Sequence, residues 1–123
     1  MENVKLLHAG LLVSDVARAR EFYEGVLGFL PKARPDLGYD GAWYDLGACE
    51  LHLMGTSAAL LPAQSRPPRD FHVAIAVADL AALRARLDSR GIAYRLGRHA
   101  FPQLFVRDPD GNQVELQGIG PIP

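Results

Sequence analysis

The sequence has one cysteine, no long apolar run and almost no net charge, and each shortage excludes a class of protein. Cys49 is the only cysteine among 123 residues, so no disulfide can form within the chain. No stretch approaches the roughly 20 apolar residues that a transmembrane helix needs, and the N-terminus shows no signal-peptide pattern. We therefore expect a cytoplasmic location and no membrane partner. The net charge of −1 provides no basic field for nucleic acid.

What remains is the composition of an ordinary globular protein. Hydrophobic residues make up 49% and charged residues 22% of the chain, close to the average for folded domains. Intrinsic disorder requires fewer apolar residues and a larger net charge. The length suits one compact domain with its own core and is short for two. We therefore predict a single domain over residues 1–123.

The chain repeats itself at a period of about half its length. Residues 8–15 run from a histidine through an apolar stretch to an aspartate, and residues 72–79 do the same, 64 positions later (72 − 8). Each copy also contains a Glu-Leu pair near its end. The two glutamates, Glu50 and Glu115, are 65 positions apart (115 − 50). The pattern indicates two copies of one structural module.

Each copy has the pattern of a strand, a helix and three further strands, so we predict an α+β fold made of two βαβββ modules. The aspartate after the first apolar run is a good helix N-cap, apolar residues then recur at helical spacing, and a glycine, Gly28 or Gly91, ends each helix. The expected strands are 4–14, 29–34, 42–46 and 48–54, followed by 71–78, 92–97, 103–107 and 113–118. Module one then covers about 4–54, a proline-containing linker 55–70, and module two about 71–118.

Alternation along the last strand of each module places polar side chains on one face. Successive side chains of a strand point to opposite sides of the sheet. Leu51 and Leu53 suit the side that packs on a helix, so Glu50 and His52 share the opposite face. The same alternation separates Glu115 from its apolar neighbours.

Two histidines and two glutamates stand at repeat-equivalent positions: His8, Glu50, His72 and Glu115. A two-fold relation between the modules would bring them together, where uncompensated carboxylates are costly to desolvate. Imidazole and carboxylate ligands suit Zn, Ni, Mn, Co or Fe(II). We predict that these four residues hold one divalent metal ion. His52 is the alternative to Glu50 as a ligand, and is also a candidate outer donor or general base.

Three stretches resemble the vicinal oxygen chelate superfamily, which includes glyoxalases, bleomycin resistance proteins and extradiol dioxygenases. They are HAGLLVSDVARAREFYEGVLGF at 8–29, DFHVAIAVADL at 70–80 and FVRDPDGNQVEL at 105–116. The resemblance implies a glyoxalase-like fold, in which paired βαβββ modules form a cup-shaped mixed sheet around one divalent metal. It implies His8, His72 and Glu115 as ligands, with Glu50 matching the glutamate that glyoxalase I also uses in proton transfer. It further implies a homodimer, with modules exchanged between subunits in some members.

The predicted function is that of a metal-dependent lyase or isomerase of the glyoxalase type, acting on a small substrate that chelates the metal through vicinal oxygens. Glu50, His52 and Glu115 are the candidate catalytic residues, because each can accept or donate a proton. One alternative is an extradiol-type ring-cleaving dioxygenase with Fe(II) on the two histidines and Glu115. Another is an antibiotic-binding resistance protein without catalysis.

Four residues are candidates for binding the substrate: Arg98, His99, Trp43 and Phe101. Arg98 and His99 lie in a loop before the final hairpin, where specificity residues are expected. Trp43 and Phe101 would contact an aromatic ligand, although ordinary packing is the common role of such side chains. Three further arginines are candidates for holding an anionic group: Arg34, Arg95 and Arg107.

Overall fold

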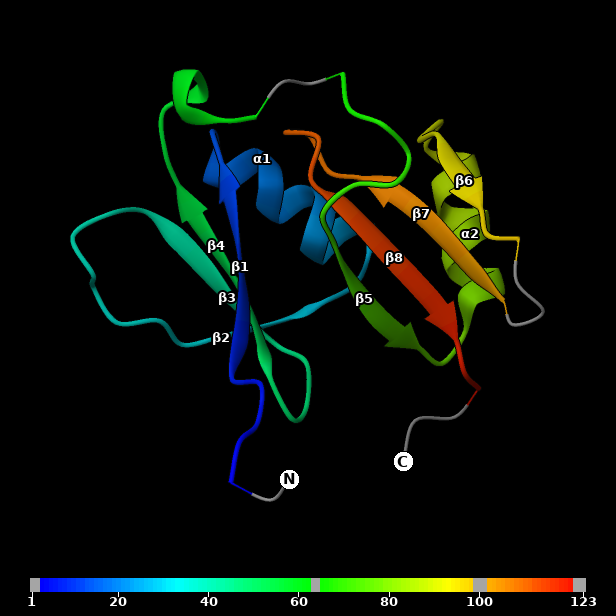
Figure 1. The fold of residues 1–123 in the computed structure, drawn as a ribbon, viewed down its shortest axis with the longest axis horizontal. Coiled ribbons are helices and arrows are strands. Elements are labelled where there is room, and N and C mark those ends of the chain that lie inside the picture. Colours follow the sequence, from blue (N-terminus) through cyan, green and yellow to red (C-terminus); the bar gives the residue numbers. More distant parts are fainter. Residues whose placement is uncertain (1–2, 63–64, 99–101, 121–123) are drawn as a thin grey trace. The chain divides into compact units, whose positions relative to one another are not determined.

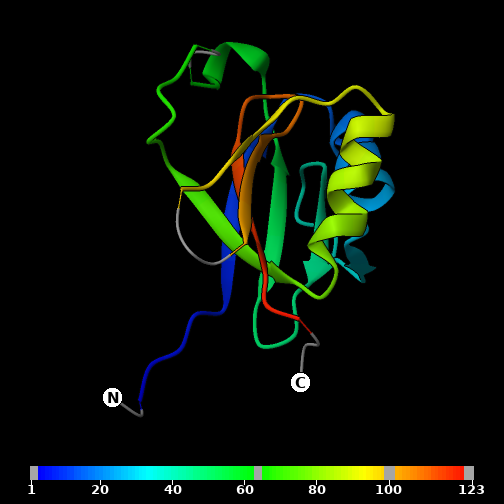
Figure 2. The ribbon, with the colours of Figure 1, turned by 90° about the vertical axis from the view of Figure 1, so that its right-hand side faces the viewer.

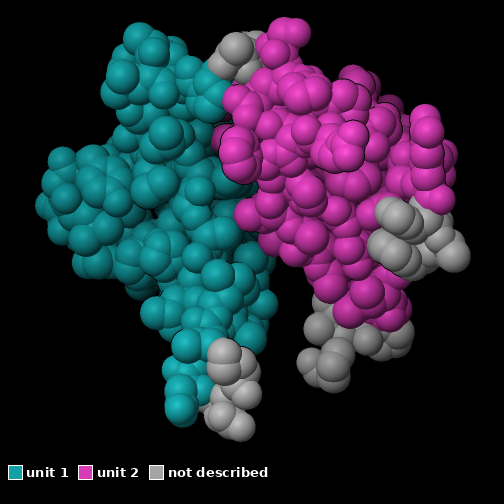
Figure 3. Space-filling view, viewed as in Figure 1, with its two compact units in different colours: residues 1–62 teal, residues 63–123 magenta. Residues whose placement is uncertain are grey.

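The structure is a computed structural model that describes residues 3–62, 65–98 and 102–120. The chain divides into two compact units, unit 1 over Met1–Pro62 and unit 2 over Ala63–Pro123 (Figure 3). The division falls inside the predicted linker, and each unit contains one βαβββ module (Figure 1). The predicted α+β class is confirmed, whereas the interpretation of residues 1–123 as a single domain stays a prediction.

Unit 1 has a four-stranded mixed sheet. Its strands are β1 (His8–Val13), β2 (Leu30–Lys32), β3 (Gly41–Asp45) and β4 (Glu50–Gly55). They lie in the order β1-β4-β3-β2, with β1 parallel to β4 and the other pairs antiparallel. A short 3-10 helix, η2 (Ala58–Leu60), follows the last strand. All four strands fall within the ranges that the sequence predicts, apart from boundary shifts of one or a few residues.

The first helix changes type along its length. It starts as α1 (Val16–Arg20), where the Asp15 carboxylate accepts a hydrogen bond from the Arg18 backbone N–H at 3.1 Å, and continues as a π-helix, η1 (Glu21–Val26). The Leu27 N–H donates to the carbonyl of Phe22, five residues back, as in π-helical turns. The predicted apolar face is buried, and Phe22 is buried with it. The sequence predicts the capping residue and the end at Gly28, but not the wider turn.

Unit 2 repeats the arrangement with β5 (His72–Val77), β6 (Tyr94–Leu96), β7 (Gln103–Arg107) and β8 (Gln113–Gly118), in the order β5-β8-β7-β6. Its helix α2 (Leu80–Ser89) begins at Asp79, whose carboxylate accepts from Ala82 N at 2.9 Å. Leu83 and Leu87 of α2 are buried against the sheet, and the helix runs along one side of it (Figure 2). No helix in the described part of the chain combines the length and apolarity needed to cross a membrane.

A glycine near the end of the last strand lets each helix approach its sheet. A Cβ on Gly55 would lie 2.9 Å from the carbonyl oxygen of Asp40 and 3.1 Å from Val16 Cγ2. A Cβ on Gly118 would lie 2.9 Å from Leu80 Cβ. Val16 and Leu80 are the first residues of α1 and α2, so the two glycines occupy the same place in the two modules.

The strands present alternating apolar and polar faces, as predicted. Leu51 and Leu53 in β4 have no exposed surface, and neither have Val114 and Leu116 in β8. The polar residues between them therefore lie on the other face of each sheet. This face of each sheet positions the candidate site.

Candidate functional site

In unit 2, His72 of β5 and Glu115 of β8 face each other across the parallel strands. The His72 Nε2 atom lies 3.3 Å from Glu115 Oε1, and Nδ1 lies 2.8 Å from the carbonyl oxygen of Asp70. A carbonyl only accepts, so Nδ1 carries the hydrogen, and a neutral imidazole then has its lone pair on Nε2. That lone pair faces a carboxylate oxygen, which is also an acceptor. The contact is favourable only with a proton or a cation between the two atoms.

The Glu115 carboxylate is buried and is held by neutral amides. Its Oε2 atom accepts hydrogen bonds from Gln103 Nε2, at 3.0 Å, and from Gln117 Nε2. Gln103 packs directly on Gly97, where a Cβ would lie 2.0 Å from Gln103 Cγ. These contacts hold one carboxylate oxygen and leave Oε1 directed at the His72 imidazole. Gln117 shares a face with Glu115 in the sequence pattern, whereas Gln103 was missed because its contact crosses between two strands.

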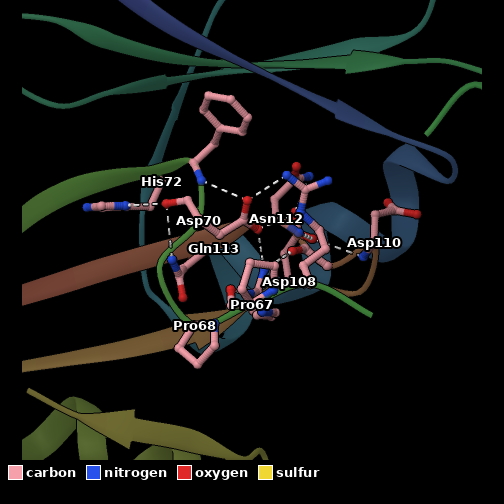
Figure 4. A network of polar contacts seen from close by, with 12 residues as sticks. Pro67, Pro68, Asp70, His72, Asp108, Asp110, Asn112 and Gln113 are labelled. Atoms are coloured by element: carbon pink, nitrogen blue, oxygen red, sulfur yellow. Dashed lines mark hydrogen bonds and ion pairs between the residues drawn. The ribbon is translucent and has the colours of Figure 1, made fainter. Parts of the chain in front are cut away.

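A network centred on Asp70 holds the carbonyl to which His72 donates (Figure 4). The Asp70 carboxylate accepts two hydrogen bonds of 2.5 Å from Arg66 and one of 2.9 Å from Arg107. The bonds from Arg66, with that from Arg107, hold the pKa of the Asp70 carboxyl well below its usual range. Arg107 also donates to the carbonyls of Gly111, at 2.8 Å, and Pro67, at 3.0 Å. The sequence makes Arg107 a candidate for holding an anionic substrate group. In the structure its guanidinium instead bonds to groups of unit 2.

The Asp108-Pro-Asp-Gly turn supplies one end of this network. The Asp108 Oδ1 atom accepts from the backbone N–H groups of Asp110 and Asn112, both at 2.9 Å. Gly111 has φ of 89°, a conformation that favours glycine, and its carbonyl accepts from Arg107. The turn thus ties the β7–β8 hairpin to the segment that precedes His72.

In unit 1, three rings stack on one another. The His52 ring lies between those of His8, with centroids 4.0 Å apart, and Trp43, with centroids 4.2 Å apart. Glu50 Oε1 lies 2.8 Å from His52 Nε2, and Glu50 Oε2 forms an ion pair with Lys32. The hydrogen bond with His52, followed by that with Lys32, lowers the pKa of the Glu50 carboxyl. The ionised carboxylate accepts from Nε2–H, so a neutral His52 keeps its lone pair on Nδ1.

The hydrogen-bonded pairing of the strands gives a different residue-to-residue correspondence between the two modules from the one that the sequence repeat suggests. The parallel ladder of unit 1 pairs His8 with Glu50, and that of unit 2 pairs His72 with Gln113. Glu50 therefore corresponds to Gln113, and the sequence-based equivalence of Glu50 with Glu115 is wrong by two residues. The reason is physical: counting residues along the chain includes the loops, which differ in length, whereas backbone hydrogen bonds determine which side chains lie opposite each other.

The antiparallel ladders agree. They pair Trp43 with His52 in unit 1 and Phe105 with Glu115 in unit 2. His52 is therefore the structural counterpart of Glu115. This correspondence was missed because a histidine and a glutamate share no sequence signal.

Each unit thus contributes a partial set of donors. Within neither unit do three His, Cys, Asp or Glu side chains of the described residues form a group that could hold a metal ion by itself. The donor chemistry of His72 and Glu115 nevertheless fits a divalent cation, because an imidazole nitrogen and a carboxylate oxygen face each other. The ligation of one metal by the predicted set from both units stays a prediction.

The predicted substrate-binding residues divide into those that the structure describes and those that it does not. Trp43 is half-buried in the ring stack, and Arg98 is exposed just after β6. His99 and Phe101 lie outside the described residues. Of the other arginines, Arg95 lies over the Phe105 ring, with its Cζ atom 4.2 Å from the ring centroid.

The fold and the sequence have known relatives. "Glyoxylase I 4" from Arabidopsis thaliana is 30% identical over 126 residues, which cover 96% of this chain and 72% of that protein. A glyoxalase/dioxygenase structure from Nostoc punctiforme matches with a TM-score of 0.77 and 21% identity, over 96% of this chain and 92% of that one. The antibiotic-binding protein TnmS3 from Streptomyces sp. CB03234 matches with a TM-score of 0.73 and 24% identity, over 96% of this chain and 98% of that one. At these identities the two structures show the fold alone. The family model described as Glyoxalase/Bleomycin resistance protein/Dioxygenase superfamily matches residues 5–116, and the chain belongs to this superfamily.

Proposed function

We propose that the protein is a metal-dependent, glyoxalase-like lyase or isomerase that acts on a small substrate with two adjacent oxygens. The observation that carries the proposal is the contact between His72 Nε2 and Glu115 Oε1, which lie 3.3 Å apart and attract each other only with a proton or a cation between them. The bond from Nδ1 to the Asp70 carbonyl sets the tautomer, as hydrogen-bonded outer groups do for metal-ligating histidines. The glyoxalase I name of the Arabidopsis relative supports the reaction class.

We assign as ligands His8 and one residue of β4 from unit 1, together with His72 and Glu115 from unit 2. They belong either to one chain or to two chains of a homodimer. The residue of β4 is Glu50 or His52. Zn, Ni, Mn, Co and Fe(II) all suit imidazole and carboxylate ligands. When bound, such an ion supplies a Lewis acid that stabilises negative charge on a substrate oxygen.

Proton transfer then falls to three residues, which differ in the partners that their side chains already have. Glu50 is ion-paired with Lys32 and has a lowered pKa, which makes it a weak acceptor of a substrate proton. Glu115 is buried, and its Oε2 accepts only from neutral amides, so we favour its carboxylate as the proton carrier. His52, with its lone pair on Nδ1, is the other candidate in the case in which Glu50 is the β4 ligand.

The test is metal uptake followed by a substrate screen. The purified chain is stripped with a chelator, titrated with Zn(II), Ni(II) or Mn(II), and assayed with the methylglyoxal–glutathione adduct. We expect one ion per site, activity only with metal, and loss of activity in Glu115→Gln. Glu21→Gln, an exposed change in η1, is the matched control and keeps full activity. A folded protein that takes up no divalent ion would contradict the proposal.

The same screen separates the dioxygenase alternative. Ring cleavage of a catechol that requires both Fe(II) and oxygen, with no activity on the adduct, would replace the lyase or isomerase assignment by an extradiol-type dioxygenase. Substitution of Fe(II) by Zn(II) would abolish that activity, because Zn(II) has no redox chemistry.

Binding of an aromatic antibiotic without turnover is the second candidate, and the ring stack of Trp43, His52 and His8 favours it. Flat rings of this kind suit stacking with an aromatic ligand. The structural relative TnmS3 is described as an antibiotic-binding protein. Trp43 is the only tryptophan, so its fluorescence reports directly on such binding. Tight quenching by a bleomycin-type ligand, with no metal requirement and no product, would favour this function.

Three further assignments stay predictions of the sequence. They are the homodimer, the cytoplasmic location, and the binding of substrate by Arg98, His99, Trp43 and Phe101. Mass measurement of the intact protein at micromolar concentration tests the first. Michaelis constants of Arg98→Ala and His99→Ala test the last.

A further inference from the structure

We propose that His52, rather than Glu50, is the metal ligand that β4 contributes, and that Glu50 is a positioning residue for the His52 ring. The inference rests on the proposed metal-dependent function and concerns the ligand that the sequence left open. It depends on three observations in unit 1 and their counterparts in unit 2.

The first observation is the place of His52 in the strand ladder. Both ladders of unit 1 put His52 at the position that Glu115 holds in unit 2. Gly55 and Gly118, where the helix meets the sheet in units 1 and 2, align His52 with Glu115 independently of the strand pairing. His52 precedes Gly55 by three residues, and Glu115 precedes Gly118 by three.

The second observation is that equivalent residues are neighbours in both units, through a nitrogen–oxygen contact in unit 2 and through ring stacking in unit 1. In unit 2 the histidine that begins the first strand, His72, touches Glu115. In unit 1 the histidine that begins the first strand, His8, touches His52, with ring centroids 4.0 Å apart. Each module therefore presents a pair of potential donors from the first and last strands, and in unit 1 that pair is His8 and His52.

The third observation is that the Glu50 carboxylate already has partners for both oxygens. Oε1 accepts from His52 Nε2, and Oε2 is paired with the Lys32 ammonium. A carboxylate neutralised by a lysine gains less from a metal ion than one held by neutral amides. The bond to Nε2 fixes the His52 ring and leaves Nδ1 with the lone pair, which is the role that outer carboxylates play for ligating histidines.

The experiment counts histidine ligands on the metal-loaded full chain. The chain is loaded with Co(II), and proton NMR counts the exchangeable imidazole N–H resonances that the paramagnetic ion shifts. We expect three, from His8, His52 and His72, each assigned by its His→Gln variant. A count of two would leave Glu50 as the β4 ligand and overturn the inference.

Affinity for Zn(II), measured by competition with a chromophoric chelator, gives the second readout. We expect Glu50→Gln to keep all three shifted resonances and to weaken Zn(II) binding by about tenfold, as changes to outer partners do. His52→Gln should weaken binding more than Glu50→Gln and remove one resonance. His52→Glu places in unit 1 the residue type that unit 2 uses, so it should restore tight binding with two shifted resonances.

The controls separate this inference from the proposed function. Circular dichroism melting checks that each variant is folded, and His52→Glu provides a second variant if His52→Gln is not. If Glu50→Gln loses Zn(II) as fully as Glu115→Gln does, while His52→Gln binds normally, the assignment is reversed and the metal function stands. If the wild-type chain takes up neither Co(II) nor Zn(II), both are overturned.

Discussion

The substitution Arg107→Ala tests whether the segment before β5 sets the orientation of His72. Arg107 bonds to the carbonyls of Pro67 and Gly111 and to the carboxylate of Asp70. The remaining bonds from strand side chains to this segment are long, at 3.3 Å from Arg95 and 3.5 Å from Gln113. Loss of Arg107 therefore leaves Asp70 with its bonds from Arg66 and the long bond from Gln113, and loosens the carbonyl that receives the His72 Nδ1–H.

The expected magnitudes follow from the bonds lost. Each of the two carbonyl bonds contributes about 1 kcal/mol net, so their loss alone, leaving aside the third bond to Asp70, should lower the free energy of unfolding by about 2 kcal/mol. Loss of an outer partner that orients a ligating histidine typically weakens metal binding by about 10- to 100-fold. Arg107→Lys should lie between, because one ammonium cannot reproduce the fixed fork of a guanidinium.

Three assays measure these effects. Urea unfolding gives the stability, chelator competition gives the Zn(II) affinity, and nitrogen-15 NMR of the metal-free protein gives the tautomer of the His72 imidazole. The fraction of the Nδ1–H tautomer should fall in Arg107→Ala and remain high in Arg90→Ala, a matched change at the end of α2. An unchanged tautomer and an unchanged Zn(II) affinity in a folded Arg107→Ala protein would refute the reasoning.

Helix docking, core packing and acid stability each have a residue that tests them. Gly118→Ala should destabilise the protein by about 1–3 kcal/mol, because the new methyl group has no room beside the start of α2; Gly10→Ala, near only the flexible end of a methionine, should cost less in the same urea titration. Leu53→Ala should lower the free energy of unfolding by about 2–5 kcal/mol, since Leu53 has no exposed surface. A smaller loss would mean that the neighbouring core side chains move in to fill the cavity. The hydrogen bond from Arg20 lowers the pKa of Glu24 below 4.5, so the stability that Glu24 contributes is present above that pH and is lost as the pH falls through its folded-state pKa. The stability difference between wild type and Glu24→Gln should therefore shrink as the pH falls below 4.5, and a constant difference would contradict the assignment.

Much of the fold was predictable because its signals are local. Asp15 and Asp79 cap the two helices as expected, since a side chain three residues from its partner N–H needs no distant contact. The alternation of Leu51 and Leu53 with polar residues correctly gave the buried face of β4. The π-helical turn of η1 was not predictable, because it depends on how Phe22 and its neighbours pack.

The residues of the candidate site also divide into those that the sequence predicts and those that only the structure shows. The sequence singled out His72 and Glu115, and the structure brings them within 3.3 Å of each other. It did not identify Gln103 or Asp70, whose bonds with Glu115 and Arg107 join segments that are separated in the chain. Polar residues of this kind carry no periodic signal, so only the folded unit shows which of them meet.

The sequence by itself determined that this protein is a duplicated βαβββ chain, because hydrophobic periodicity, capping residues and turn glycines act over a few residues; its link to the glyoxalase superfamily came from the resemblance of three motifs. Only the tertiary structure decided that His52, and not Glu50, is the counterpart of Glu115. The reason is that strand register is set by hydrogen bonds between strands separated by loops of unequal length, and a shift of two residues preserves the polar face while changing which side chain is opposite.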